Sequence, residues 1–210
     1  MSIDKSIVWS YVEGLPLEDQ TLLRARDRAR DLGVASISPA TGALLSVLAA
    51  SSKAHTVVEI GARTGVSGIY LLRGLSPQAV LTSIDVDAEH LKACRDAFSE
   101  AGFPGNRTRT ISGRANDVLP RLTDAAYDLV FLNADKSSYP GYIEQGIRLL
   151  KPSGLLVVHD ALDGGRVAEP ARREEHTVLL RKAAKELRED PRLLTAVVPV
   201  GDALLLATKR

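Results

Sequence analysis

The chain has 210 residues, 45% hydrophobic and 25% charged, with a formal net charge of +1. This length and composition suit one globular domain and exclude a disordered or membrane-spanning chain, since no run approaches the roughly 20 apolar residues that a span needs. The balanced charge provides no basic field for nucleic acid, which favours small molecules as partners. The N-terminal MSIDKSIVWSYVEGL carries acidic residues and no sustained apolar core, unlike a secretory signal.

The single cysteine, Cys94, allows no internal disulfide, as is typical of a cytoplasmic protein. It lies in a helical pattern with Leu91 and Phe98. Because free cysteines are commonly buried, we expect Cys94 to pack in the core and not to act as a nucleophile.

Residues 1–36 are expected to form an N-terminal helical segment that packs on the core or on a second subunit. Its part from Leu17 to Asp31 is dense in Arg and Asp, with Leu22 and Leu23 between them, which predicts a solvated helix. The acidic residues offset the basic ones and no aromatic residue is interleaved, which disfavours a nucleic-acid surface. Ser38 and Pro39 then form a typical helix start, with serine as the cap and proline in the first turn.

The stretch from Thr56 to Asp87 predicts a βαβ unit. The β-branched run Thr56–Ile60 reads as a strand, Gly61–Gly65 as a turn and Val66–Leu75 as a helix, with Ser67 as a candidate cap. A second strand, Val80–Ile84, ends at Asp85. The unit therefore places a glycine turn and a carboxylate at the carboxyl ends of adjacent parallel strands, where Asp85 suits two ribose hydroxyls.

The spacing of the residues in this turn limits the class of ligand that it can bind. Arg63 and Val66 occupy the places where a G-x-G-x-x-G fingerprint has glycine, which disfavours a dinucleotide. The spacing of Glu59, Gly61 and Gly65 suits a nucleoside ligand without phosphate, such as S-adenosylmethionine. A purely structural turn with an exposed Asp85 is the alternative.

The rest of the chain alternates between apolar patterns typical of strands and apolar patterns typical of helices. This alternation predicts an α/β sheet that is mostly parallel and covered on both faces. The two last strands are joined by a short turn, Pro199–Asp202, and predict an antiparallel hairpin. No linker interrupts the pattern, so residues 1–210 are expected to form a single domain. The expected elements are helix 88–101, strand 108–112, a short helix from 113 to about 122, strand 128–132, helix 139–150, a turn at 152–154, strand 155–158, helix 174–189, and strands 194–198 and 203–208.

Ordered motifs from Ile37 to Arg210 resemble the cation-dependent O-methyltransferases of the catechol and caffeoyl-coenzyme A type, in particular their small bacterial members. The resemblance implies a Rossmann-like, doubly wound, seven-stranded sheet with an antiparallel last strand, and a homodimer. The matching pieces are Ser38-Pro39 with Gly42–Leu45, Val58–Gly61 with Thr64-Gly65 and Ser67, Ile84–Asp87, Ser112–Ala115, Tyr127–Phe131 with Ala134–Lys136 and Tyr139, Gly164–Val167, and Pro199–Asp202.

The resemblance also implies the binding site for S-adenosylmethionine. The two glycines of the turn let the methionine part approach, Ser67 bonds its carboxylate, and Asp85 takes the ribose hydroxyls. The adenine is bordered by residues 113–115, and two residues close over the cofactor from the N-terminal side. The full implied set is Ala35, Ile37, Glu59, Gly61, Gly65, Ser67, Asp85, Val86, Gly113, Arg114, Ala115 and Asn133.

The chain differs from the family at the positions that bind the divalent cation. The family holds the cation with an Asp after the fourth strand and an Asp-Asn pair after the fifth, and these positions are Asn133, Asp160 and Ala161 here. One carboxylate remains, and alanine supplies no ligand, so the sequence predicts a weak or absent metal site.

Two residues are candidates for the general base. Lys136 keeps the place of the family's base but needs a depressed pKa to accept a proton at neutral pH. His159, next to Asp160, has a suitable unperturbed pKa, although strand alternation can point its side chain to the other face. Asp135 is an alternative surface partner of Lys136.

The sequence thus predicts an O-methyltransferase that transfers the methyl group of S-adenosylmethionine to a hydroxyl of a small, aromatic acceptor. The expected catalytic residues are Lys136, His159 and Asp160. The alternative is an S-adenosylmethionine-binding protein of the same fold with lost or altered transferase activity. Nicotinamide-dependent oxidoreduction is disfavoured by Arg63 and Val66.

Overall fold

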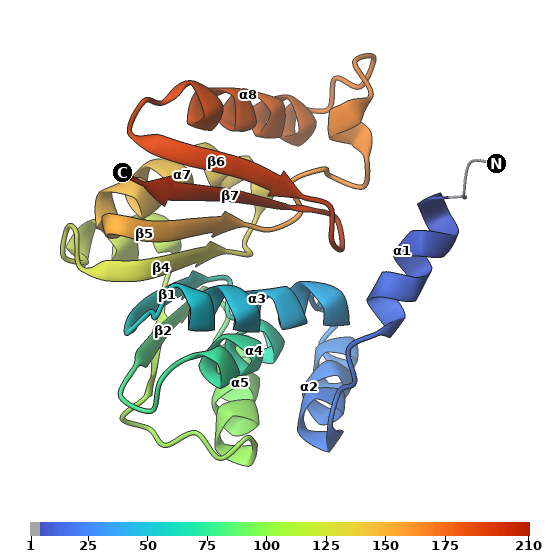
Figure 1. The fold of residues 1–210 in the computed structure, drawn as a ribbon. Coiled ribbons are helices and arrows are strands. Elements are labelled where there is room, and N and C mark those ends of the chain that lie inside the picture. Colours follow the sequence, from blue (N-terminus) through green and yellow to red (C-terminus); the bar gives the residue numbers. More distant parts are fainter. Residues whose placement is uncertain (1–4) are drawn as a thin grey trace.

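The fold is built on a seven-stranded sheet with the strand order β3-β2-β1-β4-β5-β7-β6 (Figure 1). The computed structural model describes residues 5–210, so residues 1–4 of the predicted N-terminal segment lie outside the described residues. Strands β1 to β5 pair in parallel, whereas β7 runs antiparallel to both β5 and β6. The predicted fold class, including the antiparallel end of the sheet, is confirmed.

The strands are β1 (Thr56–Ile60), β2 (Val80–Asp85), β3 (Thr108–Ser112), β4 (Tyr127–Leu132), β5 (Leu150–Val158), β6 (Leu193–Val198) and β7 (Leu204–Lys209). The α-helices are α1 (Lys5–Gly14), α2 (Gln20–Asp31), α3 (Pro39–Ser51), α4 (Val66–Gly74), α5 (Ala88–Glu100), α6 (Ala115–Val118), α7 (Tyr139–Leu149) and α8 (Glu175–Glu189). The short 3₁₀ helices within residues 5–210 are η1 (Leu119–Arg121), η2 (Lys136–Ser138) and η3 (Arg166–Ala168).

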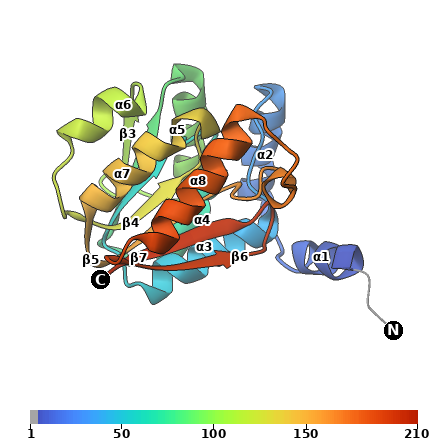
Figure 2. The same cartoon turned by 90° about the horizontal axis from the view of Figure 1, so that it is seen from above.

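Two hydrophobic clusters cover the two faces of the sheet, because alternate side chains of each strand point in opposite directions. Val57 and Phe131 pack with α2 to α5, whereas Val58 and Val130 pack with α6 to α8. Figure 2 shows these two groups of helices on either side of the strands. Cys94 lies in the first cluster and is fully buried, and burial raises the pKa of its thiol well above the ordinary value, which confirms its packing role.

Helix α2 rests on the domain as predicted. Leu22 is fully buried while Leu23 is exposed, and Arg24 and Arg28 both bond Glu100 of α5. Arg26 pairs with Glu18 at 2.6 Å. The basic residues of α2 are thus used in ion pairs within the domain.

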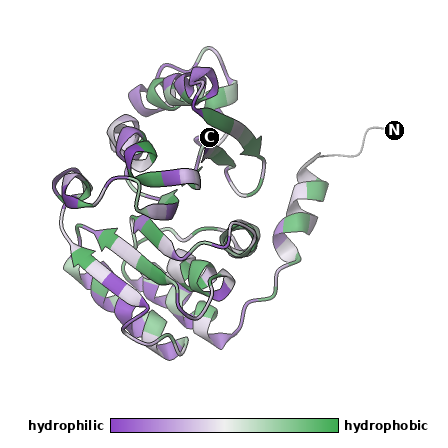
Figure 3. Cartoon of the chain, turned by 60° about the vertical axis from the view of Figure 1, so that its left-hand side comes forward, coloured by the Kyte–Doolittle hydropathy of each residue, from purple (hydrophilic) through white to green (hydrophobic). Residues whose placement is uncertain are grey.

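Helix α1 projects from the rest of the fold and carries hydrophobic positions, drawn green in Figure 3. It contacts the turn between β6 and β7. The indole N–H of Trp9 donates to the carbonyl of Pro199 at 2.9 Å, and the backbone N–H of Gly201 donates to Glu13 Oε1 at 2.8 Å.

Local predictions around the sheet have mixed outcomes. The Ser38-Pro39 helix start is confirmed, since Ser38 Oγ accepts the backbone N–H of Thr41 at 3.2 Å and Pro39 is the first residue of α3. The predicted start of the fifth strand at Leu155 is wrong, since β5 begins at Leu150. The predicted turn at residues 152–154 is a bulge inside this strand, because β5 advances from Leu150 to Leu155 while β4 advances from Tyr127 to Leu129, and Ser153 has φ +65°. Hydrogen bonds to β4 on both sides of the irregularity keep this stretch in the strand.

The predicted cap of α4 is also wrong. The N-cap residue is Gly65, with φ +86°, and the hydroxyl of Ser67 bonds Glu59 instead. A side chain at Gly65 would lie 3.1 Å from the backbone of Cys94, so the turn needs glycine for both its conformation and its close packing on α5.

Candidate functional site

A cavity of about 720 Å³ opens at the carboxyl ends of β1, β2 and β4. Strand β1 pairs with β2 on one side and β4 on the other, so this edge is the topological switch point at which α/β sheets bind ligands. The cavity is lined by Gly33, Val34, Ala35, Ile60, Gly61, Arg63, Ile84, Asp85, Val86, His90, Gly113, Arg114, Ala115, Asn116, Asn133, Ala134, Asp135, Ser138 and Tyr142.

Eight of the twelve predicted cofactor residues lie in this lining: Ala35, Gly61, Asp85, Val86, Gly113, Arg114, Ala115 and Asn133. They come from five segments that are separated in sequence. The structure therefore brings the glycine turn, the strand-end carboxylate and the 113–115 loop together around one space.

The Asp85 carboxylate is oriented by the backbone around it. Its Oδ2 accepts the N–H of Arg63 at 2.8 Å, and its Oδ1 accepts the N–H of Asp87 at 3.0 Å. His90 Nδ1 lies 3.5 Å from Oδ1. Because a carboxylate oxygen accepts about two hydrogen bonds, one position on each oxygen remains for a ligand.

The other four predicted cofactor residues, Ile37, Glu59, Gly65 and Ser67, pack against the protein and do not line the cavity. Glu59 is fully buried and accepts hydrogen bonds from Ser67 and, at 2.9 Å, from Ser83. Burial raises the pKa of Glu59 to about 7. Glu59 and Ser67 thus form a buried polar pair beneath the glycine turn.

Asn133 lines the cavity and carries a buried amide oxygen. The side chain is 2% exposed, and its Nδ2 lies 3.5 Å from the carbonyl of Gly61. Its Oδ1 accepts no hydrogen bond from the described residues. A buried acceptor without a partner is costly, so a ligand donor that reached this oxygen would be stabilised there.

His159 lies on the face of the sheet covered by α3 and α4. Its ring is 6% exposed and tilted against Phe131, and its Nε2 lies 3.3 Å from Asp160 Oδ1. Burial lowers the pKa of His159 to about 4, so the ring is neutral at pH 7. Its Nδ1 is buried and has no partner among the described residues.

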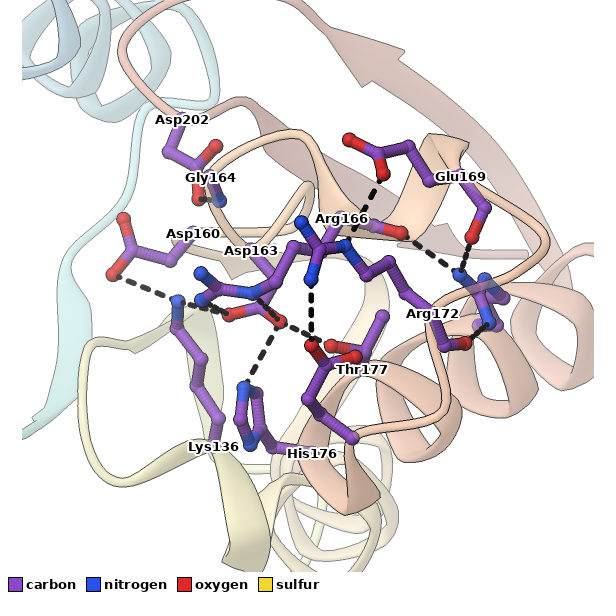
Figure 4. Close-up of polar contacts among 12 residues, drawn as sticks. Lys136, Asp160, Asp163, Gly164, Arg166, Glu169, Arg172, His176, Thr177 and Asp202 are labelled. Atoms are coloured by element: carbon purple, nitrogen blue, oxygen red, sulfur yellow. Dashed lines mark hydrogen bonds and ion pairs between the residues drawn. The ribbon is translucent and has the colours of Figure 1, made fainter.

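Lys136 belongs to an ion-pair cluster at the carboxyl end of β5 (Figure 4). Its Nζ lies 3.1 Å from Asp163 Oδ1 and 3.6 Å from Asp160 Oδ2, so its partners are these two carboxylates. The alternative pairing of Lys136 with Asp135 is wrong, since the Asp135 side chain accepts the hydroxyl of Ser137.

Asp163 is the centre of this cluster, and the sequence did not assign it a role. It is fully buried, and Arg166, Thr177 and His176 also contact its carboxylate. The guanidinium of Arg166 is the largest cause that holds the pKa of Asp163 far below its usual range. The available sequence signal was the i,i+3 spacing of Asp163 and Arg166 around two glycines.

The side chains at the family's metal positions do not fit a divalent cation. Asn133 supplies a neutral oxygen, Ala161 supplies none, and both oxygens of Asp160 face cationic or donor groups. Residues 5–210 contain no group of three His, Cys, Asp or Glu side chains placed to hold a metal.

Comparisons with known proteins identify the family. The model of the O-methyltransferase family matches residues 18–210. A protein from Mycobacterium marinum named as an O-methyltransferase is 49% identical over 200 residues, which cover 95% of this chain and 89% of the relative.

Two solved structures share the fold. A Corynebacterium glutamicum protein has a TM-score of 0.89 and 31% identity, covering 98% of this chain and 96% of the other. The O-methyltransferase TomG from Streptomyces achromogenes, solved in complex with SAM, has a TM-score of 0.87 and 26% identity, covering 100% and 99%. The chain therefore belongs to the O-methyltransferase family, whose members are S-adenosylmethionine-dependent methyltransferases.

Proposed function

We propose that this protein methylates a hydroxyl group of a small aromatic acceptor, with S-adenosylmethionine bound in the cavity between β1, β2 and β4. The observation that carries the proposal is the pair of polar residues in the cavity lining, Asp85 and Asn133. Asp85 offers two carboxylate oxygens, and Asn133 offers a buried oxygen without a partner.

These groups match the donors of S-adenosylmethionine. The ribose diol suits the carboxylate of Asp85, and the methionine ammonium suits the amide oxygen of Asn133. The first backbone N–H groups of α4, which have no acceptor within the helix, suit the methionine carboxylate. When bound, the cofactor supplies a methyl group activated by its sulfonium.

The family relationship and the cavity residues that follow Asn133 in the chain support an aromatic acceptor. The motifs resemble those of enzymes that methylate aromatic hydroxyls. Ser138 and Tyr142 also line the cavity, and Lys136 lies with Ser138 in η2. We expect these residues to border the acceptor and to hold its hydroxyl in line with the methyl group.

The buried ring of His159 supports a positioning role and not that of the base. Its Nδ1 is buried, and His159 does not belong to the residues that line the cavity, so the ring does not reach an acceptor there in this conformation. Its Nε2 contact with Asp160 instead fixes the carboxylate that pairs with Lys136.

The test is a turnover assay with a panel of catechols and phenols. The protein and S-adenosylmethionine are incubated with each acceptor, and methylated product and S-adenosylhomocysteine are quantified by mass spectrometry. Stoichiometric formation of both on at least one acceptor is expected. Tight S-adenosylhomocysteine binding with no product across the panel would instead favour a binding protein that has lost activity.

We also propose that the protein forms a homodimer. Ile7 and Tyr11, one turn apart on α1, are 65% and 68% exposed, which supports a homodimer that covers this helix with a second copy. Light scattering should give twice the chain mass, and Ile7→Glu/Tyr11→Glu should reduce it to one chain. A native monomer would refute the dimer.

The free, buried Cys94 supports the cytoplasm as the compartment. No helix within residues 5–210 has the length and apolar character that a membrane crossing needs.

A further inference from the structure

We propose that the ammonium group of Lys136 takes the place of a divalent cation in this chain and stabilises the negative charge of the acceptor oxygen during methyl transfer. This inference rests on the proposed function and assigns the residue that contacts the reacting oxygen. It follows from the mismatch between the family's metal positions and the side chains present here.

The first argument is the occupied carboxylate. Asp160 is the single acidic residue among the three metal positions, and its Oδ2 lies 3.6 Å from Lys136 Nζ. A divalent cation bound to Asp160 would lie close to this ammonium, and two like charges at such a separation repel strongly in a partly buried site. The Lys136 side chain is 23% exposed, so solvent screens this repulsion only in part.

The second argument is the rigid support of the ammonium. Asp163 Oδ1, fully buried, lies 3.1 Å from Lys136 Nζ and 2.8 Å from Arg166 Nη2. The backbone N–H of Gly164 donates to Asp202 Oδ2 at 2.7 Å, which ties the loop to the β6–β7 turn (Figure 4). Asp163 is therefore a positioning residue that holds Lys136 through contacts independent of any ligand.

The third argument is the location of the group. Lys136 is not itself a lining residue, but it lies between Asp135 and Ser138, which line the cavity, and its side chain is 23% exposed. The ammonium has three N–H donors, and two face Asp160 and Asp163. The third is available to an acceptor oxygen.

The chemistry balances without a metal. The acceptor oxygen forms a bond to the methyl carbon while the carbon–sulfur bond breaks and sulfur keeps its electron pair. The hydroxyl proton passes to water, and Lys136 keeps its protons throughout. A fixed cation that faces a developing charge accelerates such a step because it needs no reorganisation.

The experiment measures the charge effect directly with 4-nitrocatechol, whose catecholate form absorbs visible light. The native protein is saturated with S-adenosylhomocysteine in excess EDTA, and the absorbance of bound 4-nitrocatechol is titrated against pH. We expect an increase of about tenfold or more in the acid dissociation constant of the bound catechol, as a nearby opposite charge produces.

Three variants make the result specific. Lys136→Met should abolish the increase, and Lys136→Arg, which retains the charge, should keep most of it. Lys151→Met is the matched control, because Lys151 also pairs with a strand-end carboxylate, Asp128 at 2.7 Å, but at the opposite end of β4. It should behave as the native protein. An increase that persists in Lys136→Met, or that requires magnesium in the native protein, would overturn the proposal.

Turnover gives a second, separable readout. On an acceptor that the native protein methylates, kcat/KM should be unchanged by EDTA and should fall about 100-fold in Lys136→Met. Activity that EDTA abolishes and magnesium restores would overturn this inference and leave the proposed function intact. Absence of turnover on every acceptor would refute the proposed function, while the 4-nitrocatechol titration would still decide the role of Lys136.

Discussion

Replacing Asp85 with asparagine should weaken S-adenosylhomocysteine binding strongly. Asp85→Asn keeps the shape of the side chain but turns one carboxylate oxygen into an NH₂ group. In the structure, Oδ1 and Oδ2 each accept one backbone N–H, from Asp87 and Arg63, and Asp85 lines the cavity. The asparagine therefore loses one acceptor and the charge that strengthens the other. A charge-assisted hydrogen bond contributes about 1.5–3 kcal/mol, which corresponds to roughly a ten- to hundredfold rise in Kd.

Isothermal titration calorimetry with S-adenosylhomocysteine measures this change. Asp96→Asn is the matched control, since Asp96 lies on α5 and pairs with Lys92 at 3.0 Å, away from the cavity lining. Unfolding in urea without ligand separates lost affinity from lost stability, because the N–H groups of Arg63 and Asp87 depend on the same carboxylate. An Asp85→Asn protein that is folded and binds within about twofold of the native affinity would refute the ribose assignment.

Three further predictions concern stability, each measured by urea unfolding. Gly42→Ala should lower the free energy of unfolding by about 1–3 kcal/mol, because the added methyl group would overlap the Tyr70 ring where α3 packs on α4. Gly105→Ala is the control and should be neutral, because a methyl group there meets open space. Equal stability of the two variants would contradict this packing. The pKa of Glu59 is raised from 4.5 to about 7, so this carboxyl contributes about 3 kcal/mol below pH 4.5 that is lost as the pH rises through 7. Glu59→Gln should remove that loss. If the variant and the native protein showed the same dependence of unfolding free energy on pH, Glu59 would be ionised when buried. The pKa of His159 is lowered from 6.5 to about 4, so its contribution to stability should fall as the pH drops from 6.5 towards 4, and His159→Gln should remove this fall. The Glu59 and His159 slopes oppose each other in the native protein, so each is resolved only when the other is removed.

The sequence by itself determined the elements that depend on local pattern. The β-branched run before Gly61, the apolar spacing after Gly65 and the Ser38-Pro39 start are signals within a few residues of the elements they specify, and the structure has β1, α4 and α3 there. The positions of Asp85 and Asn133 at strand ends follow from the same signals, because the carboxyl ends of parallel strands meet at one edge of a sheet. Both residues line the cavity.

Only the tertiary structure decided which polar groups meet. Ser67 is close to the start of α4 in sequence, yet its hydroxyl turns to Glu59, whose buried carboxylate needs a donor more than the solvated first turn of the helix does. Lys136 could pair with Asp135 beside it, but it bonds Asp163, 27 residues away. The buried Asp163 lacks water to solvate its charge, whereas an exposed aspartate has water, so the cations gather on the buried carboxylate. Such choices depend on burial, which is a property of the assembled fold and not of any local stretch of the chain.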